Sequence, residues 1–383
     1  MGVLKIGIVG AGIGGLAAAN ALHQAGHDVV VFEQSRQFLR VGADINLTPN
    51  AVRALDGLGA DIAQAVRASA ARPTHRISRT WDTGEETSRL AMGDEAERKY
   101  GAPQLTIHRA DLLAALADAF PAERVRFGKR AQSIEARADG GVAIRFTDDS
   151  EATQLDVLIG ADGIHSVVRN AMFGAESPRF TGVVAFRAVV PTERVKDVPN
   201  IQAFTKWWGA TPESQIVTFP LNQGRDTFIF ATTAQDSWHE ESWTTPGSVD
   251  ELRGFYANFH PDARALLDAC DSVLKTALYE RDPLTVWSQG HMTLVGDACH
   301  PMMPFMAQGA GMAIEDGVVL ARNLAAVTAP AQVTAALRRY EAMRIERASQ
   351  IQVGSRGNNW LRAGGNADWV YGYDAWSVPL DAS

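Results

Sequence analysis

The chain is poor in cysteine and carries no excess of basic residues. Its 383 residues include two cysteines, Cys270 and Cys299. These are too few for a disulfide framework and have no neighbours at metal-ligand spacing, so we expect no metal site and a reducing, cytoplasmic environment. The net charge is −8, with acidic and basic residues mixed along the sequence. This charge pattern argues against nucleic acid as a partner.

The chain also lacks an apolar run long enough to cross a bilayer. Residues 6–22 are uncharged and mostly apolar, but clustered glycines interrupt them and a second strand pattern follows in place of a cleavage site. Position 6 is Ile6, where the myristoylation pattern requires serine or threonine. The sequence therefore predicts no signal peptide, membrane anchor or lipid anchor.

No low-complexity tract, long run of like charges or internal repeat divides the chain. Its length favours two domains, and the absence of a linker composition favours domains that are interleaved in one body.

The first chemical motif follows an apolar strand pattern at residues 5–9. Four glycines open the helix pattern that comes next, Gly10, Gly12, Gly14 and Gly15. In a dinucleotide-binding unit such glycines provide a tight turn, a close approach of backbone to the pyrophosphate, and close packing of helix on strand. The next apolar strand, residues 29–32, ends at Glu33 and Gln34. Glu33 is placed to accept hydrogen bonds from ribose hydroxyl groups.

A second strand pattern, residues 157–160, leads into Asp162 and Gly163 and then into a helix containing Ser166 and Arg169. An acidic residue at this place either caps the helix or contacts a ligand, and the segment by itself favours neither.

A third strand pattern, residues 294–296, leads into Asp297 and a turn that contains His300 and Pro301. A helix pattern then begins at Gly309, Ala310 and Gly311. Backbone at these glycines can lie close to a planar ring, and the N–H groups of the helix start favour negative charge there.

Residues 180–275 differ from both flanking regions, because they contain short alternating strand patterns rich in aromatic and β-branched residues. The sequence predicts an α/β fold in which a Rossmann-like nucleotide-binding domain is interleaved with an antiparallel β-sheet substrate domain, followed by C-terminal helices. We assign residues 1–72, 98–178 and 276–335 to the nucleotide-binding domain, residues 73–97 and 179–275 to the substrate domain, and residues 336–383 to a C-terminal helical segment.

The three motifs, in this order and spacing, resemble those of the single-component FAD-dependent aromatic hydroxylases, the group that includes p-hydroxybenzoate hydroxylase and salicylate hydroxylase. The resemblance covers nearly the whole chain. It implies FAD as cofactor and, because only one G-x-G-x-x-G is present, NADH or NADPH as a transient co-substrate. It further implies that O2 is used to hydroxylate a small aromatic or pyridine-type acid through a flavin C4a-hydroperoxide, with or without decarboxylation.

The same resemblance implies roles for individual residues. Arg109 reaches the FAD phosphates, Asp162 and Gly163 contact the pyrophosphate and assist the nicotinamide, Asp297 binds the ribitol, and Pro301 flanks the face of the flavin that reacts with oxygen. His300 is better interpreted as a turn histidine bonded to backbone than as a base.

Several stretches, among them residues 206–208 and 369–374, resemble a subgroup that acts on a hydroxypyridine carboxylate. The substrate region departs from that subgroup. Asn46 stands where it has a histidine thought to act on the substrate hydroxyl, and an amide cannot take a proton. We therefore expect deprotonation through water or another residue, or a substrate activated by an amino group.

Other side chains are candidates for the substrate region. Phe219 is expected to line the catalytic pocket, with Phe230 and Met306 as further apolar walls. The alternative for each of the three is an ordinary place in the core. A substrate carboxylate is expected at Arg187 or Arg281, each of which could equally form a surface ion pair.

The aromatic pair at residues 207–208 is better interpreted as core or interface than as substrate pocket. The aromatic residues of the C-terminal segment are expected to pack on the body of the protein or on a partner subunit.

Two alternatives to plain hydroxylation remain open. One is oxygenative ring opening of a pyridine-type substrate, and the other is a flavoprotein dehydrogenase or sensor that does not oxygenate. Formation of a homodimer is also left open by the sequence.

Overall fold

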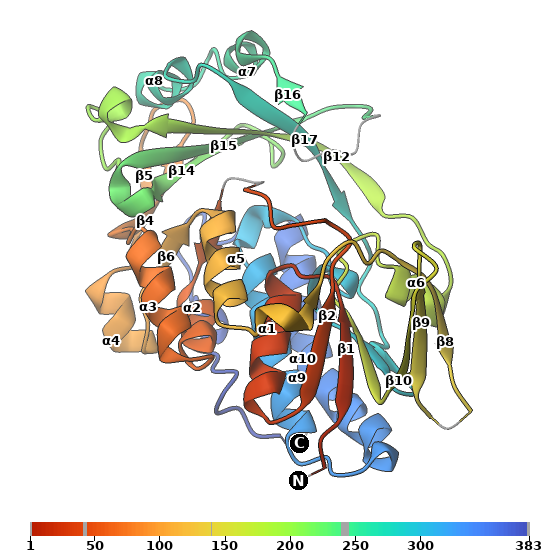
Figure 1. Cartoon of the computed structure of the whole chain (residues 1–383). Coiled ribbons are helices and arrows are strands. Elements are labelled where there is room, and N and C mark those ends of the chain that lie inside the picture. The colour runs from red at the N-terminus through yellow and green to blue at the C-terminus, as the bar shows by residue number, and fades with distance from the viewer. Residues whose placement is uncertain (1, 41–43, 139, 239–244, 381–383) are drawn as a thin grey trace.

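The computed structural model describes residues 2–40, 44–138, 140–238 and 245–380. It contains two large sheets, one above the other in Figure 1, with helices packed on both.

The lower sheet has six strands in the order β18-β19-β11-β1-β2-β7, and all its neighbours run parallel except β18 and β19. Its bounds are β1 Lys5–Val9, β2 Asp28–Phe32, β7 Val125–Arg126, β11 Val157–Gly160, β18 Ser288–Gln289 and β19 Met292–Leu294. Because β1, β11 and β19 are adjacent and parallel, their carboxyl ends meet at one edge of the sheet. The three motifs found in the sequence follow these ends.

Helices α1 (Ile13–Gln24), α9 (Gly309–Leu324) and α10 (Val333–Arg356) pack beside this sheet. Small residues allow α1 and α9 to approach closely. A Cβ atom placed on Gly317 would lie 2.7 Å from the backbone nitrogen of Ala18, and one placed on Gly14 would lie 3.0 Å from Cβ of Ala313. Gly14 therefore contributes to the packing of the two helices.

The upper sheet has eight strands in the order β16-β17-β12-β15-β14-β13-β4-β5. Its bounds are β4 His75–Thr80, β5 Glu86–Ala91, β12 Arg179–Pro191, β13 Phe204–Trp208, β14 Gln215–Leu221, β15 Asp226–Ala234, β16 Pro246–Gly247 and β17 Val273–Glu280. Every neighbouring pair is antiparallel except β13 and β4.

The two faces of this sheet have different neighbours. Its outer face is covered by α7 (Val249–Phe255) and α8 (Pro261–Asp268), which share a hydrophobic cluster with Trp207 and Phe186. Its inner face clusters with Met303 and Phe305, from the segment between β19 and α9. The sequence predicted strands throughout residues 180–275, so α7 and α8 correct it. Each is only two turns long, too short for a clear helical periodicity.

Smaller elements complete the fold. A three-stranded sheet contains β8 (Ala131–Ala136), β9 (Val142–Phe146) and β10 (Glu151–Leu155), and a two-stranded sheet pairs β3 (Ile45–Leu47) with β6 (Leu105–Ile107). The remaining α-helices are α2 Pro49–Asp56, α3 Ala60–Ser69, α4 Asp94–Tyr100, α5 Arg109–Asp118, α6 Val167–Phe173 and α11 Asp368–Tyr371. Within the described ranges, no helix combines the length and apolar character that crossing a membrane requires.

The C-terminal aromatic segment packs on the body of the protein. Tyr371 is buried against Tyr100, with ring centroids 5.8 Å apart, and the indole N–H of Trp376 donates to the carbonyl oxygen of Ala54 at 2.9 Å. Of the two alternatives left open by the sequence, packing on the body of the protein is the one observed for these residues.

Candidate active site

The glycine turn after β1 excludes larger residues at two positions. Gly10 has a φ of +101°, and a Cβ atom placed on it would lie 2.4 Å from the carbonyl oxygen of Ala161. A Cβ atom on Gly15 would lie 2.0 Å from the carbonyl oxygen of Gly10. At Gly12, in contrast, an added Cβ atom meets no protein atom within 4 Å. The turn is thus closed on its protein side and open at Gly12, where a ligand could approach.

Helix α1 begins at this open glycine. Its N-cap is Gly12, no side chain caps its first N–H groups, and its first turn contains no acidic residue. Unpaired N–H groups at a helix start form a site for an anion such as a phosphate.

Glu33 ties the end of β2 to the glycine turn. Its Oε2 atom accepts a hydrogen bond from the N–H of Ala11 at 2.9 Å, and its Oε1 atom accepts from the N–H of Ser35 at 2.8 Å. Each carboxylate oxygen can accept a further bond, and the side chain is only half-buried. Gln34 is exposed beside it. Both residues lie at the sheet edge where the sequence placed them.

Asp162 caps helix α6. Its carboxylate accepts from the Ser166 hydroxyl at 2.5 Å and from the N–H groups of Val167 at 2.7 Å and Val168 at 3.2 Å. The helix-cap interpretation of this aspartate is therefore correct, and ligand contact at Asp162 stays a prediction. Gly163 follows with a φ of +77° and open space around its Cα atom.

Asp297 lies in a short 3-10 helix, Gly296–Ala298. Water reaches its side chain, although surrounding protein raises the pKa of its carboxyl by burial. The nearby positive groups of His300 and Arg109 oppose that shift. Arg109, the first residue of α5, thus lies near Asp297 although the two are far apart in the sequence.

His300 differs from its sequence-based interpretation, since it binds a carboxylate and not backbone. Its Nε2 atom lies 2.6 Å from Oδ2 of Asp316, and both side chains are at most 1% exposed. Burial disfavours the charged ring, but Cys299 and Asp316 together raise the pKa of His300 well above its ordinary value. We therefore assign His300 a charged, structural role.

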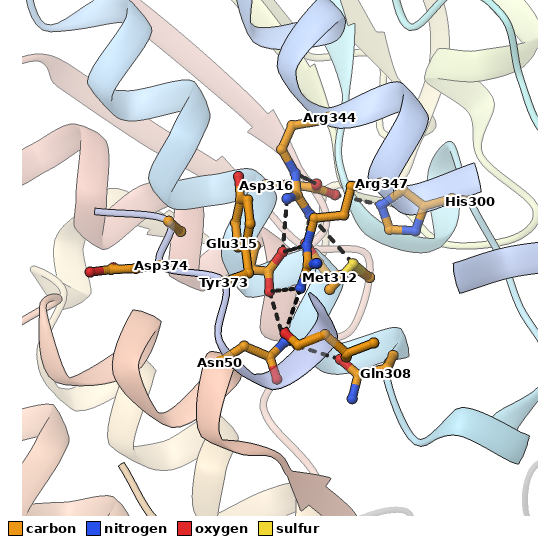
Figure 2. A network of polar contacts seen from close by, with 12 residues as sticks. Asn50, His300, Gln308, Met312, Glu315, Asp316, Arg344, Arg347, Tyr373 and Asp374 are labelled. Carbon is orange, nitrogen blue, oxygen red and sulfur yellow. Dashed lines mark hydrogen bonds and ion pairs between the residues drawn. The ribbon is translucent and has the colours of Figure 1, made fainter. Parts of the chain in front are cut away.

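A buried ionic network connects His300, Glu315 and Asp316 with two arginines of α10 (Figure 2). Arg344 of α10 donates to Oδ1 of Asp316 at 2.8 Å and to Oε2 of Glu315 at 2.7 Å. Arg347 donates to the two oxygens of Glu315 at 2.9 and 3.0 Å. Asp316 also accepts from the backbone N–H of Gly296 at 2.9 Å. The network therefore fixes the turn that carries Asp297 against two helices.

The network extends to the start of α9. Oε1 of Glu315 accepts from Asn50 at 2.7 Å, and Asn50 also donates to Gln308 at 3.0 Å. Gln308, the N-cap residue of α9, donates to the Thr48 hydroxyl at 2.8 Å. These bonds connect α9 with the residues that follow β3.

The network also holds the C-terminal segment. Arg347 donates to the carbonyl oxygens of Trp369 at 2.8 Å and Val370 at 2.9 Å, and its guanidinium lies 4.0 Å from the ring centre of Tyr373. The sequence analysis did not single out this network. Its available signal was a pair of adjacent acids, Glu315 and Asp316, inside an otherwise apolar helix.

Helix α9 has an uncapped start like that of α1. No side chain caps its N-terminal N–H groups, and no acidic residue stands in its first turn. Gly309 and Ala310 are partly exposed, whereas Gly311 is buried against α2, where an added Cβ atom would lie 3.3 Å from Cβ of Ala51. The first two are therefore the residues that a ligand can reach, and Gly311 serves packing.

The inner face of the eight-stranded sheet lies opposite the segment that contains Pro301. Phe219 is 3% exposed and stacks on Phe204 at 5.4 Å, in one cluster with Met303 and Phe305. Phe230 belongs to the same cluster, whereas Met306 packs with the C-terminal segment.

Asn46 is buried on β3. Its Oδ1 atom accepts from Gln104 at 2.7 Å, and its Nδ2 atom has no hydrogen-bond partner among the described residues. Gln104 thereby orients an amide N–H group that is free to donate.

The two candidate arginines differ. Arg281 is 4% exposed and donates to the carbonyl oxygens of Ile164 and Glu176, so its guanidinium is committed to the protein. It borders a cavity of about 240 Å³ together with His165 and Asn170, beside the Asp162–Gly163 turn. Arg187 lies on the inner face of the sheet and interacts electrostatically with Asp44.

The arrangement suits a flavin dinucleotide. Two uncapped helix starts, open backbone at Gly12 and Gly163, and the water-accessible Asp297 provide N–H donors for phosphates and an acceptor for hydroxyl groups.

Comparison with known proteins agrees with this fit. The family described as FAD binding domain matches residues 3–354. The chain is 40% identical to 6-hydroxynicotinate 3-monooxygenase of Pseudomonas fluorescens over 378 residues, which cover 98% of this chain and 96% of that protein.

Solved structures show the same fold. A salicylate hydroxylase substrate complex superposes with a TM-score of 0.84 at 26% identity, covering 97% of this chain and 96% of that one. HpxO of Klebsiella pneumoniae, complexed with FAD and uric acid, superposes with a TM-score of 0.82 at 28% identity, covering 95% of this chain and 90% of that one. The chain therefore belongs to the FAD-dependent aromatic hydroxylases and is a flavoprotein monooxygenase.

Proposed function

We propose that this monooxygenase hydroxylates a small aromatic or pyridine-type carboxylic acid, with O2 and NADH or NADPH as co-substrates. One observation carries the proposal. The inner face of the eight-stranded sheet presents aromatic side chains with basic groups among them, and it lies opposite the segment that links Asp297 to α9. Such a surface suits a flat, apolar ring that bears negative charge. The names of the relatives, 6-hydroxynicotinate and salicylate enzymes, support the same class.

FAD, when bound, supplies the hydride-accepting and oxygen-activating chemistry. We propose that Gly10, Gly12, Gly15 and Glu33 form its adenosine and pyrophosphate site, with Gly14 supporting that turn from behind. Gln34, Arg109, Asp162, Gly163 and Asp297 complete the contacts. The N–H groups near Gly309 and Ala310 stabilise negative charge on the ring, and Gly311 allows α9 to sit close enough to do so.

The substrate side has two tasks, to hold the ring and to exclude water. We assign the apolar walls to Phe219 and Phe230, and the boundary towards the flavin to Pro301, which is buried and whose carbonyl oxygen accepts from Gln352 at 2.9 Å.

Asn46 is proposed to orient a substrate oxygen through its free N–H group. Because Gln104 already occupies its Oδ1 atom, Asn46 acts as a donor. An Asn46→His variant is expected to change the pH profile of ring hydroxylation, since histidine titrates near pH 6.5. An unchanged profile and substrate range would exclude a role for this position.

The proposal is tested with purified holoenzyme and a panel of hydroxypyridine and hydroxybenzoate acids. We expect NADH or NADPH oxidation that an acid stimulates, together with matching oxygen uptake and a product that contains one added oxygen atom. A larger gain of oxygen would point to ring opening, and release of carbon dioxide would add decarboxylation. Oxidation without oxygen uptake would favour a dehydrogenase or sensor.

We also propose a cytoplasmic location, a homodimer and no nucleic-acid partner. Both cysteines are unpaired and buried, the net charge is −8, and Trp369 is 43% exposed on the C-terminal segment, where it could meet a second copy. Mass determination in solution tests the homodimer.

A further inference from the structure

Lys206 occupies an unusual place for a lysine. It lies in β13 between Phe204 and Trp208, on the inner face of the sheet, and is 2% exposed. Its ammonium nitrogen lies 3.7 Å from the ring centre of Trp208 and 5.6 Å from that of Phe305. Phe305 belongs to the segment between Pro301 and α9. Lys206 therefore points from the sheet towards the segment to which we assign the flavin boundary.

The partner of Lys206 is neutral. Its Nζ atom donates to Oδ1 of Asn358 at 2.5 Å, and among the described residues no carboxylate lies within ion-pair distance. Its charged neighbours are arginines. Burial, Arg76 and Arg362 all act to lower the pKa of Lys206 well below its ordinary value. A buried charge is costly unless an opposite charge compensates it, so this site favours an added anion.

Arg76 adds a second buried positive charge near Lys206. It is 4% exposed, its guanidinium lies 4.7 Å from the ring centre of Phe204, and its Nη1 atom has no hydrogen-bond partner among the described residues. Two buried basic side chains thus occupy neighbouring strands without an acid between them.

Lys275 is a second buried lysine of the same sheet, and a carboxylate compensates its charge. It lies in β17 on the outer face, is 8% exposed, and donates to Glu251 at 2.7 Å. The outer lysine therefore has a carboxylate partner from the protein, whereas the inner one has none.

The register places Lys206 in a row with Arg187 across the inner face of the sheet. Lys206 pairs with Val217, Val217 with Phe230, and Phe230 with Arg187. Three strand spacings separate the two basic residues, roughly 14 Å between backbones. Two apolar side chains lie between them. Arg187 interacts electrostatically with Asp44 and donates to the Thr276 hydroxyl.

We propose that Lys206 binds the carboxylate of the substrate and thereby makes the enzyme specific for aromatic acids. The ring lies over Val217 and Phe230, with its anionic group at the Lys206 end of the row. This inference rests on the proposed function and adds to it a residue and an orientation.

The test compares acids with their carboxamides, which keep the ring and lose the charge. Oxidised holoenzyme is titrated with 6-hydroxynicotinate, salicylate and the two matching carboxamides, and Kd is read from the change in the flavin absorption spectrum. We expect Lys206→Met to weaken binding of the preferred acid about 10- to 100-fold and that of its carboxamide less than about threefold. Lys206→Arg keeps most of the affinity for the acid, because it keeps the charge.

Lys275→Met is the matched control, since it removes a buried lysine from the opposite face of the same sheet. It should leave both affinities unchanged. FAD content and the absorption spectrum confirm that each variant is folded, and Lys206→Gln serves where Lys206→Met does not retain FAD.

The possible outcomes distinguish failure of the inference on Lys206 from failure of the proposed function. If wild type oxidises NADH or NADPH in response to an acid but Lys206→Met or Lys206→Gln binds that acid as tightly, the inference on Lys206 is wrong and the proposed function stands. An equal loss of affinity for acid and carboxamide assigns Lys206 a structural role and also overturns the inference. If no acid in the panel binds to wild type or stimulates it, the proposed function falls, and the inference falls with it.

Discussion

Asp316 and His300 form a fully buried pair, with Oδ2 of Asp316 2.6 Å from Nε2 of His300, directly behind the turn that carries Asp297. The same Oδ2 atom accepts the backbone N–H of Gly296 at 2.9 Å. One carboxylate oxygen of α9 therefore holds Gly296 before Asp297 and His300 after it.

Asp316→Asn is expected to weaken FAD binding. An amide cannot compensate the charge of His300 and Arg344, so the turn loses its fixed position and Asp297 its orientation. We expect about a 10- to 100-fold higher Kd for FAD, measured by fluorescence titration of apoprotein. The matched control is Glu341→Gln, which alters a carboxylate that accepts backbone N–H groups of Trp287 and Ser288 at 2.7 Å. An unchanged Kd in Asp316→Asn would show that the turn holds its shape alone.

Gly12→Ala is expected to separate cofactor binding from folding. The φ of Gly12 is −75°, which alanine adopts freely, and the added Cβ atom meets no protein atom within 4 Å. Apoprotein should therefore unfold at nearly the wild-type temperature, while FAD binding weakens because the methyl group occupies the space of a phosphate.

Gly10→Ala is the contrasting variant. Its φ of +101° and the 2.4 Å approach to Ala161 predict that the apoprotein itself is destabilised. If Gly12→Ala binds FAD like wild type, the cofactor does not pass this glycine.

The sequence was informative where a pattern is local and periodic. Strand β11 has the predicted bounds, and α9 begins at the predicted Gly309. The family resemblance assigned Arg109 and Asp297 to the same cofactor, and in the structure the two residues lie near each other. The domain boundaries stay predictions.

The remaining features depend on contacts between distant segments. The residues around Lys206 in the sequence do not indicate that its side chain is buried against Trp208 and the distant Phe305. The pairing of α9 acids with α10 arginines likewise depends on how the two helices face each other, which periodicity alone does not specify. In sequence terms Asp162 could act as a helix cap or contact a ligand. Its hydrogen bonds to Ser166, Val167 and Val168 show the cap, and ligand contact stays a prediction.

Glu315→Gln is expected to destabilise the protein strongly. Glu315 is fully buried and binds both Arg344 and Arg347, so its neutralisation leaves buried positive charge uncompensated. We expect a loss of about 3–5 kcal/mol in the free energy of unfolding. Denaturant unfolding of FAD-saturated protein measures it, and limited proteolysis should cut the C-terminal segment sooner, since Arg347 holds it.

Glu86→Gln provides the comparison for that variant. It breaks an exposed pair with Arg89, for which about 1 kcal/mol or less is expected. Equal losses in the two variants would mean that the buried network contributes no more than a surface pair.

Asp44→Asn is expected to stabilise the protein at neutral pH and to have little effect near pH 4. Burial raises the pKa of Asp44 to about 6, and the opposing attraction of Arg187 is too weak to reverse that shift. In an unfolded chain an aspartate titrates near pH 3.9. Between about pH 4 and pH 6 the folded protein therefore holds a proton that the unfolded chain has released. Its free energy of unfolding falls as pH rises through this window.

The free energy of unfolding of Asp44→Asn should accordingly exceed that of wild type by an amount that grows from pH 4 to pH 6 and then levels off. We expect a final difference of about 1–3 kcal/mol. The lower values allow for the partial exposure of the Asp44 side chain. Thermal unfolding of both proteins at pH 4.5, 5.5 and 7.5 measures this difference. A variant less stable than wild type at pH 7.5 would mean that the charge of Asp44 is held favourably by Arg187. Arg187, which also donates to the Thr276 hydroxyl, would then have its charge compensated within the protein, whereas the hydrogen-bond partner of Lys206 is the neutral Asn358.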